Sequence, residues 1–396
     1  MNIINLAEHD SGTKRSAIFE ELRRNILEKR YANGKLPSER ALMRRFSVSR
    51  THIRSILDEL KVKGYIFARQ GSGMYVSRRA RTMGGKIGIM ITGAFREGEG
   101  GVLPTIIAEF AREAGRNGYG VEMVEVLPDG AVNWQEKLLR IARNLVDKGV
   151  SGVICQPIDF PGDSPAVNRS VLSLFDKAGI PVALFDYDIV PTPERSEYDL
   201  VGIDNFDAGR LIGQCLVRSG AKRIAFMMED NWSLSVLGRM EGVKYAVSMS
   251  GCAAHDFAIY SMPEDTAALS RILGKRNRPD AIICGNDFLA IRLMAALEKL
   301  GMRVPEDLMV AGFDDIPLAS LQNPPLTTIR QPCASLAQTL FAALLRRMAD
   351  PSLPPSTMYM NATLVERAST IRSTTQSTPP RRRHDARRPK ERSKTK

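Results

Sequence analysis

The feature that most constrains the fold is an alternation of short β-rich runs with helical patterns through residues 86–367. Apolar strands separated by helices form parallel sheets, because each connection must cross one face of the sheet. Two neighbouring runs, VSGVICQ and IPVALFD, are echoed later by DAIICG and LMVAGFD. The sequence therefore predicts two similar α/β lobes that bind a ligand beside the carboxyl ends of their strands. The predicted strands contain KIGIMI, YGVEMVEV, VSGVICQ, IPVALFD, RIAFMM, CAAHDFAIY, DAIICG and LMVAGFDD.

The residues before these lobes predict short helices followed by a β-hairpin. The first helix has apolar residues at helical spacing and is expected to end near Tyr31. Ser38 and Ser49 are the expected N-caps of a second and a third helix. The third helix has one apolar face, which commits that side to a core. This face contains Ile53, Ile56, Leu57 and Leu60. YIFARQGSGMYVS then alternates as a hairpin with its tip at residues 70–73.

The opposite face of the third helix is basic. Arg50 and Arg54 lie one turn apart on it, with Thr51 beside them. Such a helix fits the major groove of DNA, where side chains of its first turns reach base edges. Glycines at the hairpin tip would let the backbone approach a minor groove or a phosphate. The alternative is an ordinary solvated helix face, and the alignment of the arginines with the hairpin argues against it.

Charge and cysteine usage narrow the class of protein. The formal net charge of +12 is concentrated in the first 80 residues and after residue 367, so both ends favour a polyanionic partner. Neither a signal-peptide core nor a bilayer-spanning apolar stretch is visible, so we expect a cytoplasmic location without a membrane partner. The cysteines are widely spaced, which predicts buried, reduced thiols rather than disulfides or a zinc site. They are Cys155, Cys215, Cys252, Cys284 and Cys333.

An enzyme would need a catalytic constellation, and the sequence offers little material for one. Of the 4 histidines, only His255 falls in the middle of the chain away from the third helix and the ends. A Ser-His-Asp triad or a histidine-rich metal site is therefore poorly supported. Asp314 and Asp315 could be imagined as paired acids of a glycosidase, but adjacent residues at a strand end usually point apart. We expect no enzymatic activity, no cofactor and no metal.

The N-terminal motifs resemble the winged helix-turn-helix domain of the GntR family. LPSER, VSRTHIR and RQGSGMYV match the family pattern in order and spacing over roughly 70 residues. His52 departs from the threonine usual in that family, which bears on the base sequence that is preferred. The resemblance implies that DNA is contacted by Arg40, Ser49, Arg50, Thr51, His52, Arg54, Gln70, Gly71, Ser72 and Gly73.

The central region resembles the effector domain of the LacI/GalR family, which shares its fold with periplasmic sugar-binding proteins. VGIDNFDAGRL, SVLGRMEGVKYAV, AIICGNDFLAIRLMAALEKLGMRVPEDLMVAGFDD and PPLTTIRQP carry the resemblance. It implies ligand contacts from Asp159, Arg239, Asn286 and Asp314. Aromatic residues that could lie against an apolar sugar face are Trp232, Phe95, Phe288 and Tyr187, although each could equally serve packing. Tyr187 stands in FDYD, where many relatives carry VDR.

Together the motifs predict a multi-domain protein with the arrangement of the arabinose-responsive type of regulator. A winged helix-turn-helix head precedes a two-lobed, periplasmic-binding-protein-like α/β domain with parallel sheets. The expected parts are a flexible N-terminus (1–12), a DNA-binding domain (13–77), a linker (78–85), a ligand-binding domain (86–367) and a disordered basic tail (368–396). The tail either adds non-specific DNA affinity or only keeps the chain soluble.

The expected function is a homodimeric repressor of carbohydrate-utilisation genes that binds double-stranded operator DNA. A sugar in the effector domain would release it from the operator. Other readings stay open at this point: an effector such as a nucleobase or a sugar phosphate, a sugar-acting enzyme, or a freely diffusing binding protein.

Overall fold

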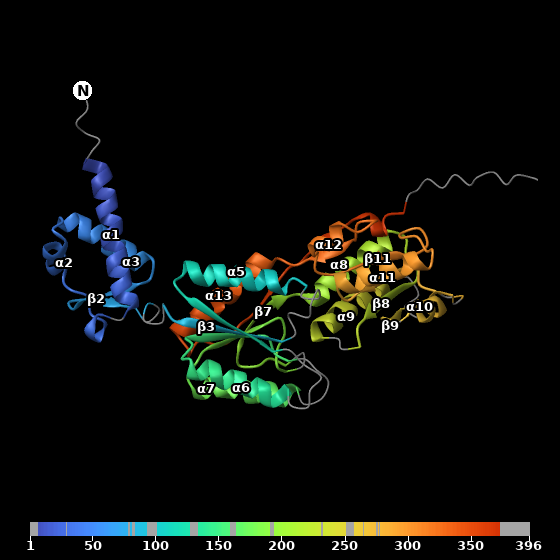
Figure 1. The fold of residues 1–396 in the computed structure, drawn as a ribbon, viewed down its shortest axis with the longest axis horizontal. Helices are drawn as coiled ribbons and strands as arrows, with labels where there is room; N and C mark the ends of the chain where they lie inside the picture. Colours follow the sequence, from blue (N-terminus) through green and yellow to red (C-terminus); the bar gives the residue numbers. More distant parts are fainter. Residues whose placement is uncertain are drawn as a thin grey trace, which may run out of the picture.

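The computed structural model arranges the chain as a head followed by two α/β lobes (Figure 1). It describes residues 7–28, 30–77, 80, 84–92, 101–126, 134–158, 164–190, 194–230, 233–250, 257–263, 265–274, 276 and 278–372. Most of the expected linker and nearly all of the expected basic tail lie outside these residues. The boundary expected at residue 367 was too early, because Ser369 and Thr370 are fully buried and bond to Thr327 of the second lobe. Within them, no helix is both long enough and apolar enough to cross a membrane.

The head contains the helices and the hairpin that the sequence predicts. Its elements are α1 (Ala7–Leu27), the 3₁₀ turn η1 (Ala32–Gly34), α2 (Glu39–Phe46), α3 (Arg50–Val62), β1 (Ile66–Arg69) and β2 (Gly73–Val76). Ser38 and Ser49 are confirmed as N-caps, because their hydroxyls accept the backbone N–H groups of Ala41 and His52. The apolar face of α3 is buried as expected, with each of its four apolar side chains at most 2% exposed.

Both ends of the first helix differ from the prediction: it begins at Ala7, inside the segment 1–12 that was expected to be flexible. The first helix ends at Leu27 rather than near Tyr31. Asn33 and Gly34 have φ values of 55° and 69°, a left-handed conformation that continues no α-helix. The Asn-Gly pair turns the chain toward α2, after α1 has already closed with Arg30 N–H donating to the carbonyl of Asn25 at 3.0 Å.

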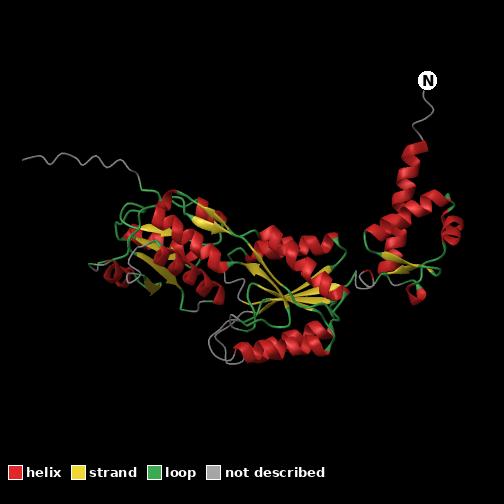
Figure 2. Cartoon of the chain, turned by 180° about the vertical axis from the view of Figure 1, so that it is seen from behind, coloured by secondary structure: helices red, strands yellow, loops and turns green. Residues whose placement is uncertain are grey.

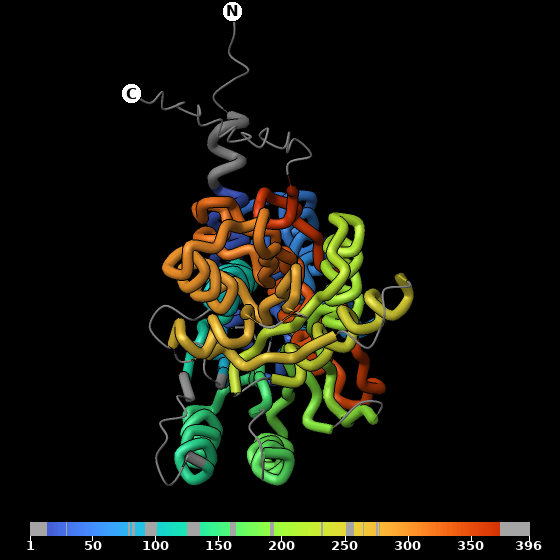
Figure 3. The backbone as a smooth tube through the Cα atoms, turned by 90° about the vertical axis from the view of Figure 1, so that its right-hand side faces the viewer, coloured from blue at the N-terminus to red at the C-terminus, as the bar shows by residue number. Residues whose placement is uncertain are grey.

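The first lobe is a six-stranded sheet between two helical layers (Figure 2). Its strands, in sheet order, are β13 (Thr357–Met360), β7 (Asp199–Ile203), β6 (Val182–Phe185), β5 (Gly152–Cys155), β3 (Lys86–Thr92) and β4 (Gly120–Val126). Helices α5 (Leu103–Arg116) and α13 (Cys333–Ala349) cover one face, and α6 (Trp134–Asp147) and α7 (Ser164–Lys177) cover the other. Figure 3 shows α6 and α7 end-on and side by side.

The second lobe repeats this plan with a four-stranded parallel sheet. Its strands, in sheet order, are β11 (Met309–Ala311), β10 (Ala281–Cys284), β8 (Ile224–Met228) and β9 (Ala258–Ser261). Helices α8 (Asn205–Arg218) and α9 (Leu234–Met249) pack on one side, and α10 (Thr266–Leu273) and α11 (Asp287–Lys299) on the other. Along β8, Phe226 faces the α8/α9 core and Met227 faces the α10/α11 core. Two buried faces explain why these strands read as continuous apolar runs.

The chain crosses between the lobes where strands were not expected. β12 (Thr328–Arg330) and β14 (Thr363–Val365) pair antiparallel beside the second lobe, which also holds α12 (Pro317–Ser320) and η3 (Ala368–Thr370). β13 returns to the first lobe and pairs with β7. At the start of β7, fully buried Asp199 accepts hydrogen bonds from Arg346 and Arg347 of α13. The predicted strands and the two-lobed parallel architecture are confirmed, and the sequence reading missed β7, β12, β13 and β14.

Candidate DNA-reading surface and effector site

The exposed face of α3 carries the arginines assigned to DNA reading. The side chains of Arg50 and Arg54 are 65% and 57% exposed. Their Nε atoms lie 3.1 Å and 3.2 Å from Oε2 of Glu39, the first residue of α2. One carboxylate therefore holds two guanidinium groups side by side at the solvent face. The sequence reading missed Glu39, although it is the acidic residue of the LPSER motif.

The other assigned residues of the helical part lie at the surface in different roles. Ser49 already uses its hydroxyl as a cap, accepting the N–H of His52 at 3.4 Å. Arg40 and Thr51 are exposed, and His52 is partly buried. Their contacts with DNA stay predictions.

The hairpin tip has the backbone that its glycines require. Gly71 and Gly73 have φ values of 70° and 110°, which side chains with a Cβ rarely adopt. Gln70 is exposed, and Ser72 Oγ lies 2.7 Å from the hydroxyl of Tyr75 on β2. The tip is therefore braced from within and presents backbone to its surroundings.

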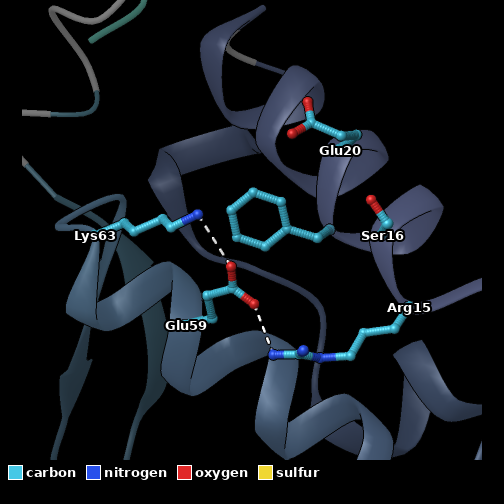
Figure 4. Close-up of a pocket in the computed structure, with 6 residues that line it drawn as sticks. Arg15, Ser16, Glu20, Glu59 and Lys63 are labelled. Carbon is cyan, nitrogen blue, oxygen red and sulfur yellow. Dashed lines mark hydrogen bonds and ion pairs between the residues drawn. The ribbon is translucent and has the colours of Figure 1, made fainter. Parts of the chain in front are cut away.

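A cavity of about 210 Å³ lies in the head between α1 and α3 (Figure 4). The carboxylate of Glu59 on α3 forms one ion pair with Nη2 of Arg15 at 2.7 Å and another with Nζ of Lys63 at 3.0 Å. The ammonium group of Lys63 also lies 4.6 Å from the ring centroid of Phe19. These contacts join the two helices, so the cavity belongs to a structural joint of the head rather than to an effector site.

The internal repeat of the lobes places two aspartates in equivalent positions. Asp186 follows β6 in the first lobe, and Asp314 follows β11 in the second. Both have a left-handed backbone, with φ values of 76° and 116°. Gln156 Nε2 donates to Asp186 at 3.3 Å, and Gln331 Nε2 donates to Asp314 at 2.7 Å. The sequence reading named Asp314 and missed Asp186, which the echo of IPVALFD and LMVAGFD could have indicated.

Arg239 of α9 interacts electrostatically with both carboxylates and is only 8% exposed. Its Nε donates to Asn205 Oδ1 at 2.9 Å and its Nη1 donates to the carbonyl of Gly285 at 2.7 Å. The guanidinium carbon lies 3.7 Å from the ring centroid of Phe313. Neither Asp186 nor Asp314 comes within the 4.0 Å of an ion pair with Arg239. Neutral oxygens thus fix the arginine while both carboxylates stay apart from it.

The electrostatics show that these groups nevertheless influence one another. Burial raises the pKa of Asp314 to about 6, although the nearby charge of Arg239 opposes the rise. Burial raises the pKa of Asp186 too, and Arg239 again opposes the effect. Burial lowers the pKa of Arg239, and the two aspartates counteract it. The three charges therefore interact through space, although no direct ion pair joins them.

The residues after β10 have partly structural roles. Asn286 caps α11, accepting the N–H of Leu289 at 2.8 Å. Phe288 is partly buried against the α10/α11 core. Fully buried Asp287, which the sequence reading did not single out, accepts from Thr328 Oγ1 at 2.6 Å and from the N–H of Ile316 at 2.9 Å. Asp287, which follows β10, thus links the segment after β11 with strand β12.

The remaining candidates are only partly placed. Tyr187 donates its hydroxyl to the carbonyl of Pro157 at 2.6 Å. Phe95, Asp159 and Trp232 lie outside the described residues. In the part of the chain that is described, no cluster of three or more His, Cys, Asp and Glu is arranged to hold a metal ion.

Comparison with known proteins agrees with this division of the chain. Residues 14–76 match the bacterial regulatory proteins of the gntR family, and residues 214–370 match the periplasmic binding protein-like domain. The HTH-type transcriptional repressor PurR of Vibrio atlanticus is 30% identical over 239 residues, which cover 59% of this chain and 68% of that repressor. The ribose operon repressor of Escherichia coli is 29% identical over 261 residues, 60% of this chain and 78% of the relative.

Solved structures share the fold. A LacI family transcriptional regulator from Enterococcus faecium with bound ribose has a TM-score of 0.58 at 22% identity, covering 72% of this chain and 98% of that one. The transcriptional regulator CelR in complex with cellobiose has a TM-score of 0.59 at 20% identity, covering 81% of this chain and 91% of that one. With a gntR-type head, a two-lobed binding domain and these relatives, the chain belongs to the LacI family of DNA-binding transcriptional regulators.

Proposed function

We propose that this protein represses carbohydrate-utilisation genes and that a sugar bound between its lobes releases it from the operator. The observation that carries the proposal is the convergence of Asp186, Arg239 and Asp314 from opposite lobes without direct ion pairing. Because its partner is operator DNA, the protein would act in the cytoplasm. We propose no enzymatic activity, in keeping with relatives that are transcriptional repressors.

The chemistry of a sugar suits these three groups. A carboxylate can accept hydrogen bonds from two adjacent hydroxyl groups of a sugar. An arginine can donate several hydrogen bonds to such hydroxyl groups, all in the plane of its guanidinium group. Asp186 belongs to the first lobe, whereas Arg239 and Asp314 belong to the second. A sugar that bonds to all three would hold the lobes at one fixed separation.

Helix α5 offers a mechanical link from this site to the head. Just before its start, Gly101 lies so near Asp314 that a Cβ on the glycine would be 3.1 Å from the carboxylate. Just after its end, Gly118 accepts a hydrogen bond from Gly84 N–H at 2.9 Å and faces Arg23 of α1. Arg23 in turn donates to the hydroxyl of Tyr65 in the head at 3.0 Å. A helix of this length spans about 21 Å. A displacement of Asp314 can therefore be transmitted through α5 to the head.

DNA reading requires two heads in our proposal. A two-fold symmetric homodimer would present two copies of α3 to the half-sites of a palindromic operator. A change in lobe separation would alter the spacing of the two heads. Coupling between such sites typically amounts to about 1–3 kcal/mol, which changes operator affinity several-fold to about a hundredfold.

The test is operator binding measured by fluorescence anisotropy, with the promoter region of neighbouring genes as labelled DNA. Addition of the right sugar from a panel of pentoses, hexoses and disaccharides should weaken binding, and a parallel assay should find no product. If the protein converts a sugar into a product and does not bind the DNA, it is an enzyme rather than a regulator. A sugar that tightens DNA binding would reverse the proposed direction of control.

A further inference from the structure

The hairpin of β1 and β2 in the head is extended by a segment that lies outside the hairpin motif. Leu36 N–H donates to the carbonyl of Met74 at 2.9 Å, and Lys35 forms an antiparallel bridge with Tyr75 of β2. The residues just before α2 therefore run beside β2 and widen the hairpin to a three-stranded surface.

The two faces of this surface differ. Ile66 and Val76, which pair across the hairpin, are 2% and 5% exposed and belong to the hydrophobic core. Because side chains alternate along a strand, the neighbouring pair of Phe67 and Tyr75 points to the other side, where Phe67 is 46% exposed. Arg69 lies two residues beyond Phe67 on β1, so it belongs to the same outer face.

Lys35 is held on the outer face close to the tip of the hairpin. Its ammonium group lies 5.8 Å from the ring centroid of Tyr75, and the centroid of that ring lies 6.0 Å from the centroid of Phe67. Its Cε would lie 3.7 Å from a Cβ on Gly73, the tip residue that pairs with Arg69. Two cations from separate segments thus meet beside the hairpin tip.

The positive charges of these two residues are not neutralised within the described part of the head. There, no carboxylate oxygen comes within the 4.0 Å of an ion pair with Lys35 or Arg69, and the sequence has no Asp or Glu between residues 60 and 85. The arginines of α3, by contrast, share the carboxylate of Glu39. The hydrogen bond with Ser72 lowers the pKa of Tyr75, and the charges of Lys35 and Arg69 lower it further. Both cations therefore act on the space around that hydroxyl.

We propose that Lys35 and Arg69 bind backbone phosphates of the operator beside the hairpin tip, and that the ring of Tyr75 holds the lysine in place. Cations that replace the counterions of DNA gain affinity from the release of those ions. Such contacts fix the position of a protein on the duplex and carry no sequence information. The inference rests on the proposed function and adds to it a DNA contact from the segment that precedes α2.

The experiment measures how steeply the DNA affinity of the full chain falls with salt. Binding to two labelled duplexes, the promoter region of neighbouring genes and an unrelated sequence of the same length, is followed by fluorescence anisotropy between about 50 and 200 mM KCl. Each phosphate contact adds about 0.9 to the slope of log affinity against log salt concentration. Lys35→Met and Arg69→Met should each flatten this slope by about 0.9 per bound head on both duplexes. Over this range of salt, each variant should lose about 3.5-fold less affinity per head than the parent protein.

Two further variants separate a local contact from a general effect of charge. Lys35→Arg keeps the positive charge and should keep the slope of the parent protein. Lys244→Met is the matched control, because Lys244 lies on α9 of the second lobe, is 59% exposed and pairs with Glu241. It makes the same change in net charge away from the head and should leave the slope unchanged.

The outcomes are distinguishable. A slope of Lys35→Met equal to that of the parent protein overturns the inference and leaves the proposed repressor intact. Equal flattening by Lys35→Met and Lys244→Met also overturns it, because net charge alone would then explain the effect. Weakening confined to the promoter duplex would make Lys35 a base-reading residue, against the assignment to phosphates. If the parent protein binds neither duplex, the proposed function itself fails and the inference falls with it.

Discussion

Replacing Arg239 by methionine should destabilise the protein in a pH-dependent way. Arg239→Met keeps an unbranched side chain on the ring of Phe313 but removes hydrogen bonds of 2.9 Å and 2.7 Å. Bonds from a charged donor contribute about 1.5–3 kcal/mol each, and breaking a buried charge arrangement costs about 3–5 kcal/mol. We therefore expect the free energy of unfolding to fall by about 3–5 kcal/mol at about pH 8.

The sign of the pH dependence follows from the carboxylates. Burial raises the pKa of Asp314 to about 6 while Arg239 holds it down, so loss of the arginine raises it further. A folded-state pKa above the unfolded value means that the native state binds the proton more tightly and loses stability as the pH rises. The variant should therefore lose less at about pH 5, which is below the pKa of Asp314, because that carboxyl is then largely protonated and needs no counter-charge.

Urea unfolding of the full chain, followed by circular dichroism at both pH values, measures this difference. Arg292→Met is the matched control, because Arg292 of α11 is 49% exposed and pairs with Glu229 at the surface, so its loss should cost less than about 1 kcal/mol. Equal destabilisation of Arg239→Met at both pH values would refute the electrostatic reasoning. A loss no larger than that of the control would refute the role of the two hydrogen bonds.

Three further predictions follow from other parts of the molecule. Arg54→Ala should cost about 1–3 kcal/mol in discrimination between operator and unrelated DNA, measured by competition in anisotropy, whereas uniform weakening on all sequences would make Arg54 a phosphate contact. Gly242→Ala should lower the free energy of unfolding by about 3 kcal/mol, because the new Cβ would lie 2.0 Å from the carbonyl oxygen of Phe206. Gly115→Ala is the control: open space surrounds this residue, so the variant should stabilise α5 by about 1 kcal/mol. Similar denaturation midpoints for the two variants would contradict the close packing of α8 on α9. Asp199→Asn should cost about 3–5 kcal/mol near neutral pH. Burial favours a higher pKa for Asp199, but hydrogen bonds from Arg347 and Ser356 lower it below the usual value, so parent and variant should converge as acid protonates the parent; a constant difference would contradict this.

Local patterns were enough to predict much of the fold. The N-caps at Ser38 and Ser49, the hairpin, and the strands β3 to β6 and β8 to β11 follow from periodicity and turn chemistry within a few residues. The end of α1 was placed too late because no glycine or proline follows Leu27 to mark it, whereas in the fold the helix closes there with Arg30 N–H donating to the carbonyl of Asn25. β13 and β7 are separated by about 150 residues of intervening chain, so their pairing has no local signal.

The sequence by itself determined the kinds of residue available at each site, and the tertiary structure decided which of them meet. The resemblance of its motifs to known families pointed to Arg239 and Asp314. Only the paired lobes show that Asp186 occupies the matching position and that neutral oxygens hold an arginine whose charge acts on both carboxylates. The clamp of Glu39 on Arg50 and Arg54 likewise depends on how α2 crosses α3. Periodicity reports which face of an element is buried, whereas contacts between charged groups depend on distances that arise only when separate elements pack together.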